Sequence, residues 1–234
     1  MRSFTICQVA LMLMTCCLHA ATVLAQPAQG TKPQTDRWAA AMEEFALQDE
    51  RSPYPEGGVV LTGSSSARLW GVEQAFPELD PPILNRGFGG STYRDLVRHA
   101  ELLVLKHRPR LVILYSGDND IAGGRSIESI QGEFEELTDR IRAELPEATI
   151  AVIPAKPSPS RWELVDKYHA LNAEIKNVCG QHEGMVYVDI WPAMLGDDGR
   201  PRPELFRDDN LHMTPAGYTI WNDAVRELVQ AEQE

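Results

Sequence analysis

Three short polar segments carry the residue types that nucleophilic catalysis needs: residues 63–66, residues 117–120 and an Asp–His pair. Asp209 and His212 stand three residues apart, so the carboxylate can reach the imidazole and set which ring nitrogen carries the proton. An imidazole oriented in this way can act as a base toward a hydroxyl, and Ser65 stands at a predicted strand-to-helix turn. The pattern predicts Ser65 as nucleophile, His212 as general base and Asp209 as the acid that orients the base.

The same loops offer hydrogen-bond donors for an oxyanion. The backbone N–H of Ser65 is expected near the positive end of a helix, where negative charge is stabilised. Gly90, in a glycine-rich turn, lets the backbone approach closely and donate a second N–H, and the amide of Asn119 supplies a third donor. Each segment alone is more often a helix cap or a turn, but their combination indicates acyl-transfer chemistry.

Alternating strands and helices must position these loops. Short apolar runs predict strands at 59–61, 83–84, 111–115, 149–153 and 185–190, and amphipathic stretches predict helices at 36–48, from 66, at 92–107, 126–145, 161–181 and 215–230. This alternation is typical of α/β proteins: a three-layer α/β/α sandwich with a mostly parallel five-stranded sheet. Thr214 and Pro215 are expected to start the last helix and so to fix the position of His212.

The N-terminal residues form a separate segment. Arg2 precedes an apolar run that ends in small residues at 23–25, which predicts a signal peptide over 1–25, cleaved near Ala25, and a periplasmic or secreted protein. The alternatives are an uncleaved anchor, although the run falls short of the ~20 apolar residues of a membrane span, and lipid attachment at Cys16 or Cys17. Residues 26–35 are expected to form a flexible tether, and 36–234 a single domain.

The composition restricts the partners. The chain has 234 residues, 43% of them hydrophobic, and a formal charge of −12. An acidic surface argues against binding to nucleic acid or to anionic membranes. Cleavage of the leader removes three of the four cysteines and leaves Cys179, so we expect no internal disulfide.

Other catalytic classes fit less well. Ala67 interrupts the Gly-x-Ser-x-Gly pattern of α/β-hydrolases. The glycines at 87–90 do not form a dinucleotide fingerprint, and the sequence contains no P-loop. It also contains no His-Glu-x-x-His motif and no paired cysteine ligands after the leader, so we expect neither a metal nor another cofactor.

Taken together, the polar segments resemble the SGNH (GDSL-type) hydrolases. The four sequence blocks of that family match residues 63–65, 85–92, 117–120 and 209–212, in order and across essentially the whole chain after the leader. The resemblance implies the flavodoxin-like SGNH fold, a triad of Ser65, His212 and Asp209, and an oxyanion hole made by Ser65, Gly90 and Asn119. Ser64 and Ser91 stand where the family often has Asp; because neither position carries protons, we expect altered loop hydrogen bonds and retained catalysis.

Residues 63–70 are similar to a subgroup that includes platelet-activating-factor acetylhydrolase catalytic subunits and lysophospholipase-L1-like enzymes. The resemblance implies a serine esterase. The sequence shows no broad apolar lid or interfacial helix, and together with the predicted export this favours short acyl or acetyl esters of small molecules, carbohydrates or lipids. The alternatives are a lysophospholipase or thioesterase of the same fold and a non-catalytic binding module. Candidate substrate contacts are Arg161, Trp162, Trp70 and Trp191, although a rigid loop and a buried core are the commoner roles for such residues.

Overall fold

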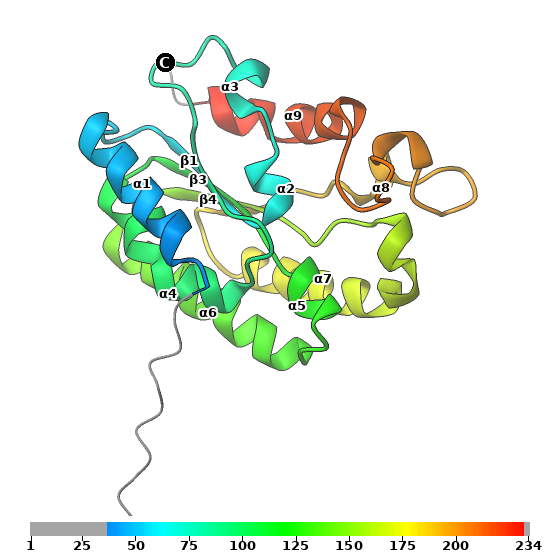
Figure 1. Cartoon of the computed structure of the whole chain (residues 1–234). Helices are drawn as coiled ribbons and strands as arrows, with labels where there is room; N and C mark the ends of the chain where they lie inside the picture. Colours follow the sequence, from blue (N-terminus) through cyan, green and yellow to red (C-terminus); the bar gives the residue numbers. More distant parts are fainter. Residues whose placement is uncertain (1–36, 232–234) are drawn as a thin grey trace, which may run out of the picture. The chain divides into compact units, whose positions relative to one another are not determined.

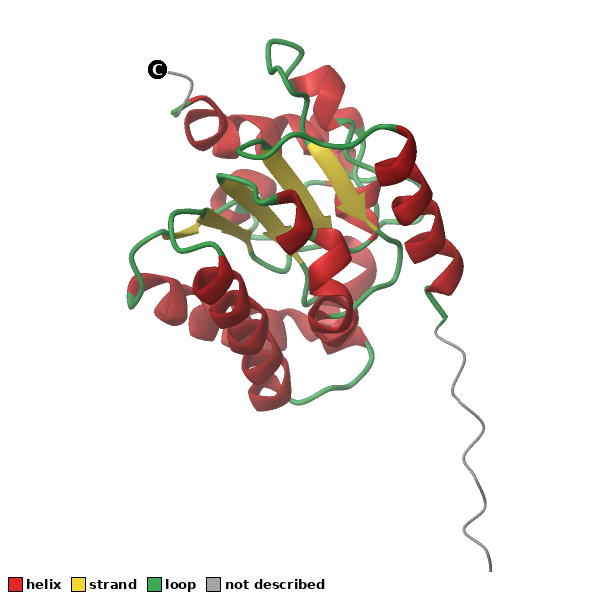
Figure 2. Cartoon of the chain, turned by 90° about the vertical axis from the view of Figure 1, so that its left-hand side faces the viewer, coloured by secondary structure: helices red, strands yellow, loops and turns green. Residues whose placement is uncertain are grey.

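The computed structural model describes residues 37–231, so the predicted signal peptide and tether lie outside the described residues. Its centre is a five-stranded sheet, seen between the helices in Figure 2. The strands are β1 (Val59–Gly63), β2 (Leu84–Gly87), β3 (Leu111–Tyr115), β4 (Thr149–Ile153) and β5 (Met185–Tyr187). They are all parallel, in the order β2-β1-β3-β4-β5, which confirms the predicted α/β fold and its five-stranded sheet.

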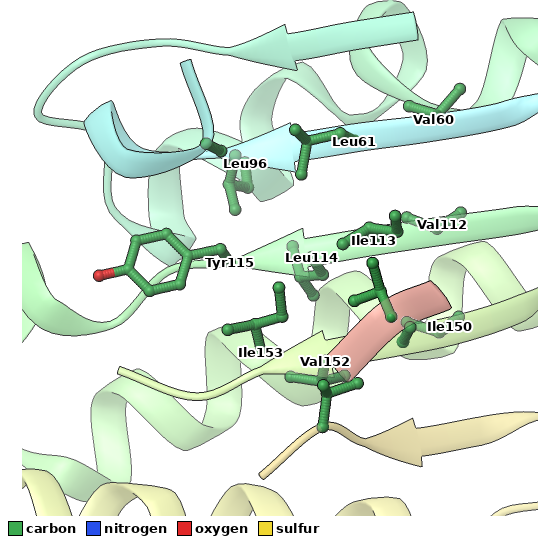
Figure 3. Packing of buried hydrophobic residues seen from close by; sticks show 14 of the residues in the cluster. Val60, Leu61, Leu96, Val112, Ile113, Leu114, Tyr115, Ile150, Val152 and Ile153 are labelled. Atoms are coloured by element: carbon green, nitrogen blue, oxygen red, sulfur yellow. The ribbon is translucent and has the colours of Figure 1, made fainter. Parts of the chain in front are cut away.

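The apolar runs form strands because the middle of the sheet is buried on both faces. All five residues of β1 and all five of β3 are buried, and β3 pairs with β1 on one side and with β4 on the other. Figure 3 shows Val112, Ile113 and Leu114 of β3 lying between side chains of β1 and β4. The sheet therefore gives the loops at its carboxyl edge a rigid base.

Helices cover both faces of the sheet. One side carries α1 (Ala39–Arg51), α4 (Tyr93–Leu103), α6 (Ile127–Glu144) and α7 (Val165–Gly180), and the other carries α2 (Ser65–Arg68), α3 (Val72–Ala75), α8 (Trp191–Met194) and α9 (Pro215–Gln230) (Figure 1). The remaining helices are α5 (Asp118–Ala122) and the 3₁₀ turns η1 (Leu105–His107), η2 (Pro159–Leu164) and η3 (Pro203–Leu205). None of the helices in the described part of the chain is long and apolar enough to span a membrane.

The strand order reverses beside β1. The chain leaves β1 toward β2 on one side and later returns to place β3 on the other side of β1. In open parallel sheets, ligands bind at the carboxyl ends of strands next to such a reversal. The segments that follow β1 and β3 contain Ser65 and Asn119, so the topology brings residues 63–66 and 117–120 together.

Several elements differ from the expected boundaries. The helix expected from residue 66 is divided into α2 and α3. The Asn85 side-chain amide donates hydrogen bonds to the carbonyls of Ala67 and Trp70, and these bonds interrupt the helix. The 161–181 helix begins as the 3₁₀ turn η2 and becomes α-helical at Val165. The fifth strand ends at Tyr187, three residues earlier than expected.

A buried ion cluster anchors α1 to the sheet. Arg86, at the end of β2, is 2% exposed and bonds to Asp49 of α1, and Lys106 reaches the same carboxylate at 2.8 Å. The start of this helix is tied down as well, because the Trp38 ring meets Phe88 edge-on at 5.3 Å between ring centres. The C-terminal end of α1 is therefore fixed against β2 and η1, and its N-terminal end against the segment that follows β2.

Candidate active site

Ser65 is presented by a sharp turn at the end of β1. Gly63, the last residue of the strand, has φ +143°, and a side chain there would lie 1.9 Å from the Tyr115 carbonyl oxygen of β3. Only glycine permits this approach. The N–H of Ser64 then donates to the same carbonyl at 3.1 Å, and Ser65 begins α2 with its side chain partly exposed.

The Asp–His pair lies in a tight turn before α9. The Asp209 Oδ1 accepts the backbone N–H groups of Leu211 and His212, both at 2.9 Å, and its Oδ2 contacts His212 Nδ1 at 2.6 Å. Thr214 caps α9 by accepting the Gly217 N–H, and Pro215 is the first helical residue, as predicted. One carboxylate thus holds both the turn and the imidazole.

The other imidazole nitrogen of His212 faces Ser65. His212 Nε2 lies 2.9 Å from the Ser65 hydroxyl, which joins two segments 147 residues apart. Desolvation raises the pKa of Asp209, but hydrogen bonds from the His212 imidazole and the turn N–H groups outweigh it and lower that pKa to about 2. The carboxylate therefore stays ionised and accepts a proton-bearing Nδ1, which leaves Nε2 as the acceptor for the hydroxyl proton.

The glycine-rich loop is hydrogen-bonded to the turn that presents Ser65. The Gly63 carbonyl accepts the Phe88 N–H at 2.9 Å and the hydroxyl of the fully buried Ser91 at 3.2 Å. Gly90 has φ +79°, and Arg37 donates to its carbonyl at 2.6 Å. Within residues 37–231, the N–H groups of Ser65 and Gly90 donate to no protein acceptor, so both are available to a ligand oxygen.

Asn119 belongs to the short helix α5, which sequence patterns did not predict because five residues are too few to show a period. Its Nδ2 donates to the Ser91 carbonyl at 3.0 Å, and its Oδ1 accepts two bonds of 3.2 Å from Arg161. The structure therefore brings the Asn119 amide next to the Gly90 loop and connects it to a charged residue from η2.

Asp120 of α5 connects this helix to the glycine-rich loop at the point where the loop enters α4. Its carboxylate, with 0% exposure, accepts the N–H of Tyr93 at the start of α4, at 3.3 Å to each oxygen, and pairs with Arg125 at 2.7 Å. Burial raises the pKa of Asp120 to about 6, although Arg125 and the Tyr93 N–H oppose the shift. The sequence motif at 117–120 included Asp120, but no role was predicted for it. Its position directly after Asn119 is the one sequence signal that could have indicated a role.

The raised pKa of Asp120 predicts how stability depends on pH. Between about pH 4 and 6 the folded state keeps this proton and the unfolded state releases it, so rising pH lowers the free energy of unfolding, by at most about 3 kcal/mol. We expect the free energy of unfolding of wild type, minus that of Asp120→Asn, to decrease from pH 4 to pH 6 in urea titrations at pH 4, 5 and 6. Asp139→Asn, at an exposed acid on α6, serves as the matched control. A difference that does not vary with pH would contradict the assignment.

The four candidate substrate contacts fall into different environments. Arg161 lies against Asn119, and Trp162 lines a pocket of about 330 Å³ together with Arg200 and with Asn210 of the Asp–His turn. Trp70 is 3% exposed and packs among Tyr218 and Trp221, and its indole N–H donates to Asn222; Trp191 is 7% exposed and donates to the Ala155 carbonyl. The structure thus brings Arg161 to the site and places Trp70 and Trp191 in the core.

Two buried charges near Asn119 were not singled out as functional from the sequence. Asp118 precedes Asn119 and pairs with Arg161 at 3.0 Å, and Lys156, with 0% exposure, lies 3.6 Å from the same carboxylate. Charge alone gave no signal for them, because most charged residues of a soluble protein face solvent. In the part of the chain that the structure describes, no three His, Cys, Asp or Glu side chains gather as metal ligands.

The family model of GDSL-like lipases and acylhydrolases matches residues 62–220, which include all four polar segments. The chain therefore belongs to the GDSL-like lipase/acylhydrolase family, and the resemblance seen in the sequence is confirmed. No curated protein sequence matches the chain.

Solved structures share the fold at low sequence identity. A protein from Streptococcus pneumonia, described by the name platelet activating factor, superimposes with a TM-score of 0.73 and 16% identity over 81% of this chain and 91% of its own. A GDSL-like lipase from Bacteroides thetaiotaomicron superimposes with a TM-score of 0.70 and 21% identity, over 82% of this chain and 98% of its own. A catalytic mutant of an acetylxylan esterase from Geobacillus stearothermophilus superimposes with a TM-score of 0.62 and 16% identity, over 75% of this chain and 95% of its own.

Proposed function

We propose that this acylhydrolase-family protein is a serine esterase that hydrolyses carboxylic esters of short acyl or acetyl groups. The observation that carries the proposal is the position of His212, which is hydrogen-bonded at once to the Ser65 hydroxyl and to the Asp209 carboxylate. A nucleophile, a base and an orienting acid in one line are what acyl transfer through a serine requires.

The proposed reaction starts with attack of Ser65 Oγ on the ester carbonyl while its proton moves to His212 Nε2. Asp209 stabilises the imidazolium that forms. The tetrahedral intermediate collapses as the C–O bond to the alcohol breaks, and His212 passes its proton to that leaving oxygen. Water then attacks the acyl-enzyme by the same route and releases the carboxylic acid and Ser65.

The negative charge on the tetrahedral oxygen needs donors that are already in place. We assign this role to the free N–H groups of Ser65 and Gly90 and to the second N–H of the Asn119 amide. The Gly90 loop is held by Arg37 and Ser91, and Asn119 by Ser91 and Arg161, so these donors need little rearrangement during the reaction.

A fold relative and one pocket support the substrate class. The acetylxylan esterase shares the fold, and the pocket of about 330 Å³ beside Asn210 combines the Trp162 indole and three prolines with guanidinium and amide groups. Apolar faces beside hydrogen-bond donors suit an alcohol such as a sugar. Acetylated xylo-oligosaccharide, a lysophospholipid and an acyl thioester, supplied at equal concentration, separate the carbohydrate esterase from the two alternative activities.

The decisive experiment is labelling of the folded protein with a fluorophosphonate, followed by peptide mapping. The proposed function predicts a covalent adduct on Ser65 and hydrolysis of p-nitrophenyl acetate. Folded wild-type protein that neither labels nor hydrolyses this ester would leave a non-catalytic binding module as the correct interpretation.

Replacing Asn119 with alanine tests the oxyanion assignment. Loss of one preorganised donor is expected to lower kcat for p-nitrophenyl acetate by about 10²–10³-fold and to change KM little, because the donor acts mainly on the transition state. Steady-state kinetics with a thermal unfolding control checks this. A kcat within threefold of wild type would remove Asn119 from the oxyanion hole.

A further inference from the structure

The neighbours of the Asn119 amide permit only one of its two orientations. The Oδ1 atom faces the guanidinium of Arg161, which donates two bonds of 3.2 Å, and Nδ2 faces the Ser91 carbonyl at 3.0 Å. A guanidinium can only donate hydrogen bonds and a carbonyl can only accept them. A flipped amide would place N–H groups against the guanidinium and oxygen against oxygen, so both contacts would become repulsive.

Arg161 is itself held in place. Its guanidinium pairs with the Asp118 carboxylate at 3.0 Å, and that carboxylate also accepts the Tyr115 hydroxyl at 3.0 Å. Asp118 is 5% exposed, and the Arg161 side chain 19% exposed. A planar fork that is fixed on one side by a buried carboxylate can present its remaining N–H groups in a defined direction.

A second buried cation lies beside Asp118. Lys156 is fully buried with its ammonium 3.6 Å from the Asp118 carboxylate, and within the described residues the ammonium makes no hydrogen bond besides this ion pair. Burial lowers the pKa of Lys156, and the charges of Asp118 and Asp209 oppose that shift. The Asp118 carboxylate therefore faces two cationic side chains, and its contact with Arg161, at 3.0 Å, is the shorter one.

From these contacts we propose that Arg161 is a positioning residue of the oxyanion hole: it holds the Asn119 amide in the orientation that directs Nδ2 toward the substrate. The inference rests on the proposed esterase function. One Nδ2 hydrogen is committed to Ser91, so the locked amide offers its second hydrogen to the oxyanion. Without Arg161 only the Ser91 carbonyl favours this orientation, so the amide flips in part of the molecules, and in those its oxygen faces the developing negative charge.

A double-mutant cycle separates this role from direct substrate binding. Arg161→Ala is expected to lower kcat for p-nitrophenyl acetate by about 10–100-fold with KM within threefold, because the substrate carries no anionic group for Arg161 to bind. In an Asn119→Ala background the same substitution is expected to lower kcat by less than about threefold, since the group it positions is gone. Guanidinium chloride at non-denaturing concentration is expected to restore part of the lost kcat in Arg161→Ala alone.

Arg140→Ala is the matched control, because Arg140 is an exposed arginine of α6 that forms ion pairs with Glu101 and Glu144. It should leave kcat within twofold of wild type. If Arg161→Ala does not fold, Arg161→Lys replaces it; this variant keeps the charge near Asp118 but lacks the fork, and an unchanged kcat in it overturns the proposal.

Equal losses from Arg161→Ala in both backgrounds would also overturn the proposal, because Arg161 would then act independently of Asn119. Failure of the esterase function would look different: wild type would neither hydrolyse the ester nor react with the fluorophosphonate. An active wild type, an impaired Asn119→Ala and an unimpaired Arg161→Ala would refute this inference and leave the proposed function standing.

Discussion

Ser65→Ala is expected to lower kcat for p-nitrophenyl acetate by about 10⁴–10⁶-fold, which leaves only the contribution of the oxyanion donors and of binding. The Ser65 hydroxyl bonds only to His212 within the described residues, and its side chain is partly exposed. Its removal should therefore leave the thermal midpoint close to that of wild type. Kinetics and thermal unfolding on the same preparation measure both effects.

The neighbouring serine is a sharp control for this substitution. Ser64 is 1% exposed, and its hydroxyl has no hydrogen-bond partner within residues 37–231, so Ser64→Ala sacrifices no bond. We expect Ser64→Ala to keep activity within a few-fold of wild type, in line with the prediction that catalysis tolerates a residue other than Asp at this position. Comparable activity in Ser65→Ala and Ser64→Ala would exclude Ser65 as the nucleophile.

Asp209→Asn is expected to lower kcat by about 10⁴-fold, the loss that follows when a catalytic histidine is held in the wrong tautomer. The carboxylate uses one oxygen for the N–H groups of Leu211 and His212 and the other for His212 Nδ1. Asparagine has a single oxygen. If that oxygen accepts the N–H groups of the turn, the NH₂ group of the asparagine faces His212 Nδ1. Nδ1 must then be the acceptor and Nε2 must carry the proton, so the imidazole cannot accept the Ser65 proton.

Asp208→Asn controls for the change of charge in the same turn, because Asp208 is exposed and directly precedes the orienting acid. It should retain nearly full activity. The pKa of about 2 for Asp209 adds a second expectation: above about pH 3 the wild-type carboxylate remains ionised, so protonation of Asp209 does not limit the rate there. Activity in Asp209→Asn within tenfold of wild type would contradict its role.

Much of the fold could be predicted from the sequence because its signals are local. The runs at β3 and β4 are continuous and apolar, and the structure has both strands with the predicted boundaries. Helix α9 begins at Pro215 and ends at Gln230, as expected from its cap and its period. The helix after β1 was misjudged because the tertiary hydrogen bonds of Asn85 interrupt it before its local pattern ends. The fifth strand is shorter than its apolar run, which ends at Ile190.

The sequence was enough to predict which residues form the candidate site, but not the contacts that hold them in place. Ser65, Asp209 and His212 follow from chemistry and spacing, and the structure brings them within hydrogen-bond distance. The contacts of Arg161 with Asn119 cross 42 residues and depend on how η2 turns back over α5. No periodicity in a single sequence encodes such a contact, so Arg161 was expected only as a possible substrate ligand.

The placement of α1 decides how the protein can be attached to a surface or fused to another domain. Arg37 and Trp38, the first described residues, contact Gly90, so a fusion that replaces or displaces these two residues also disturbs the loop that contains Gly90. At the other end of the fold, Val229 of α9 accepts a bond from Arg110, which precedes β3 at the amino edge of the sheet. Immobilisation through the C-terminal end of α9 therefore acts at the edge of the sheet opposite the Ser65 and Asn119 turns, whereas an N-terminal fusion that alters Arg37 or Trp38 acts directly on the Gly90 loop.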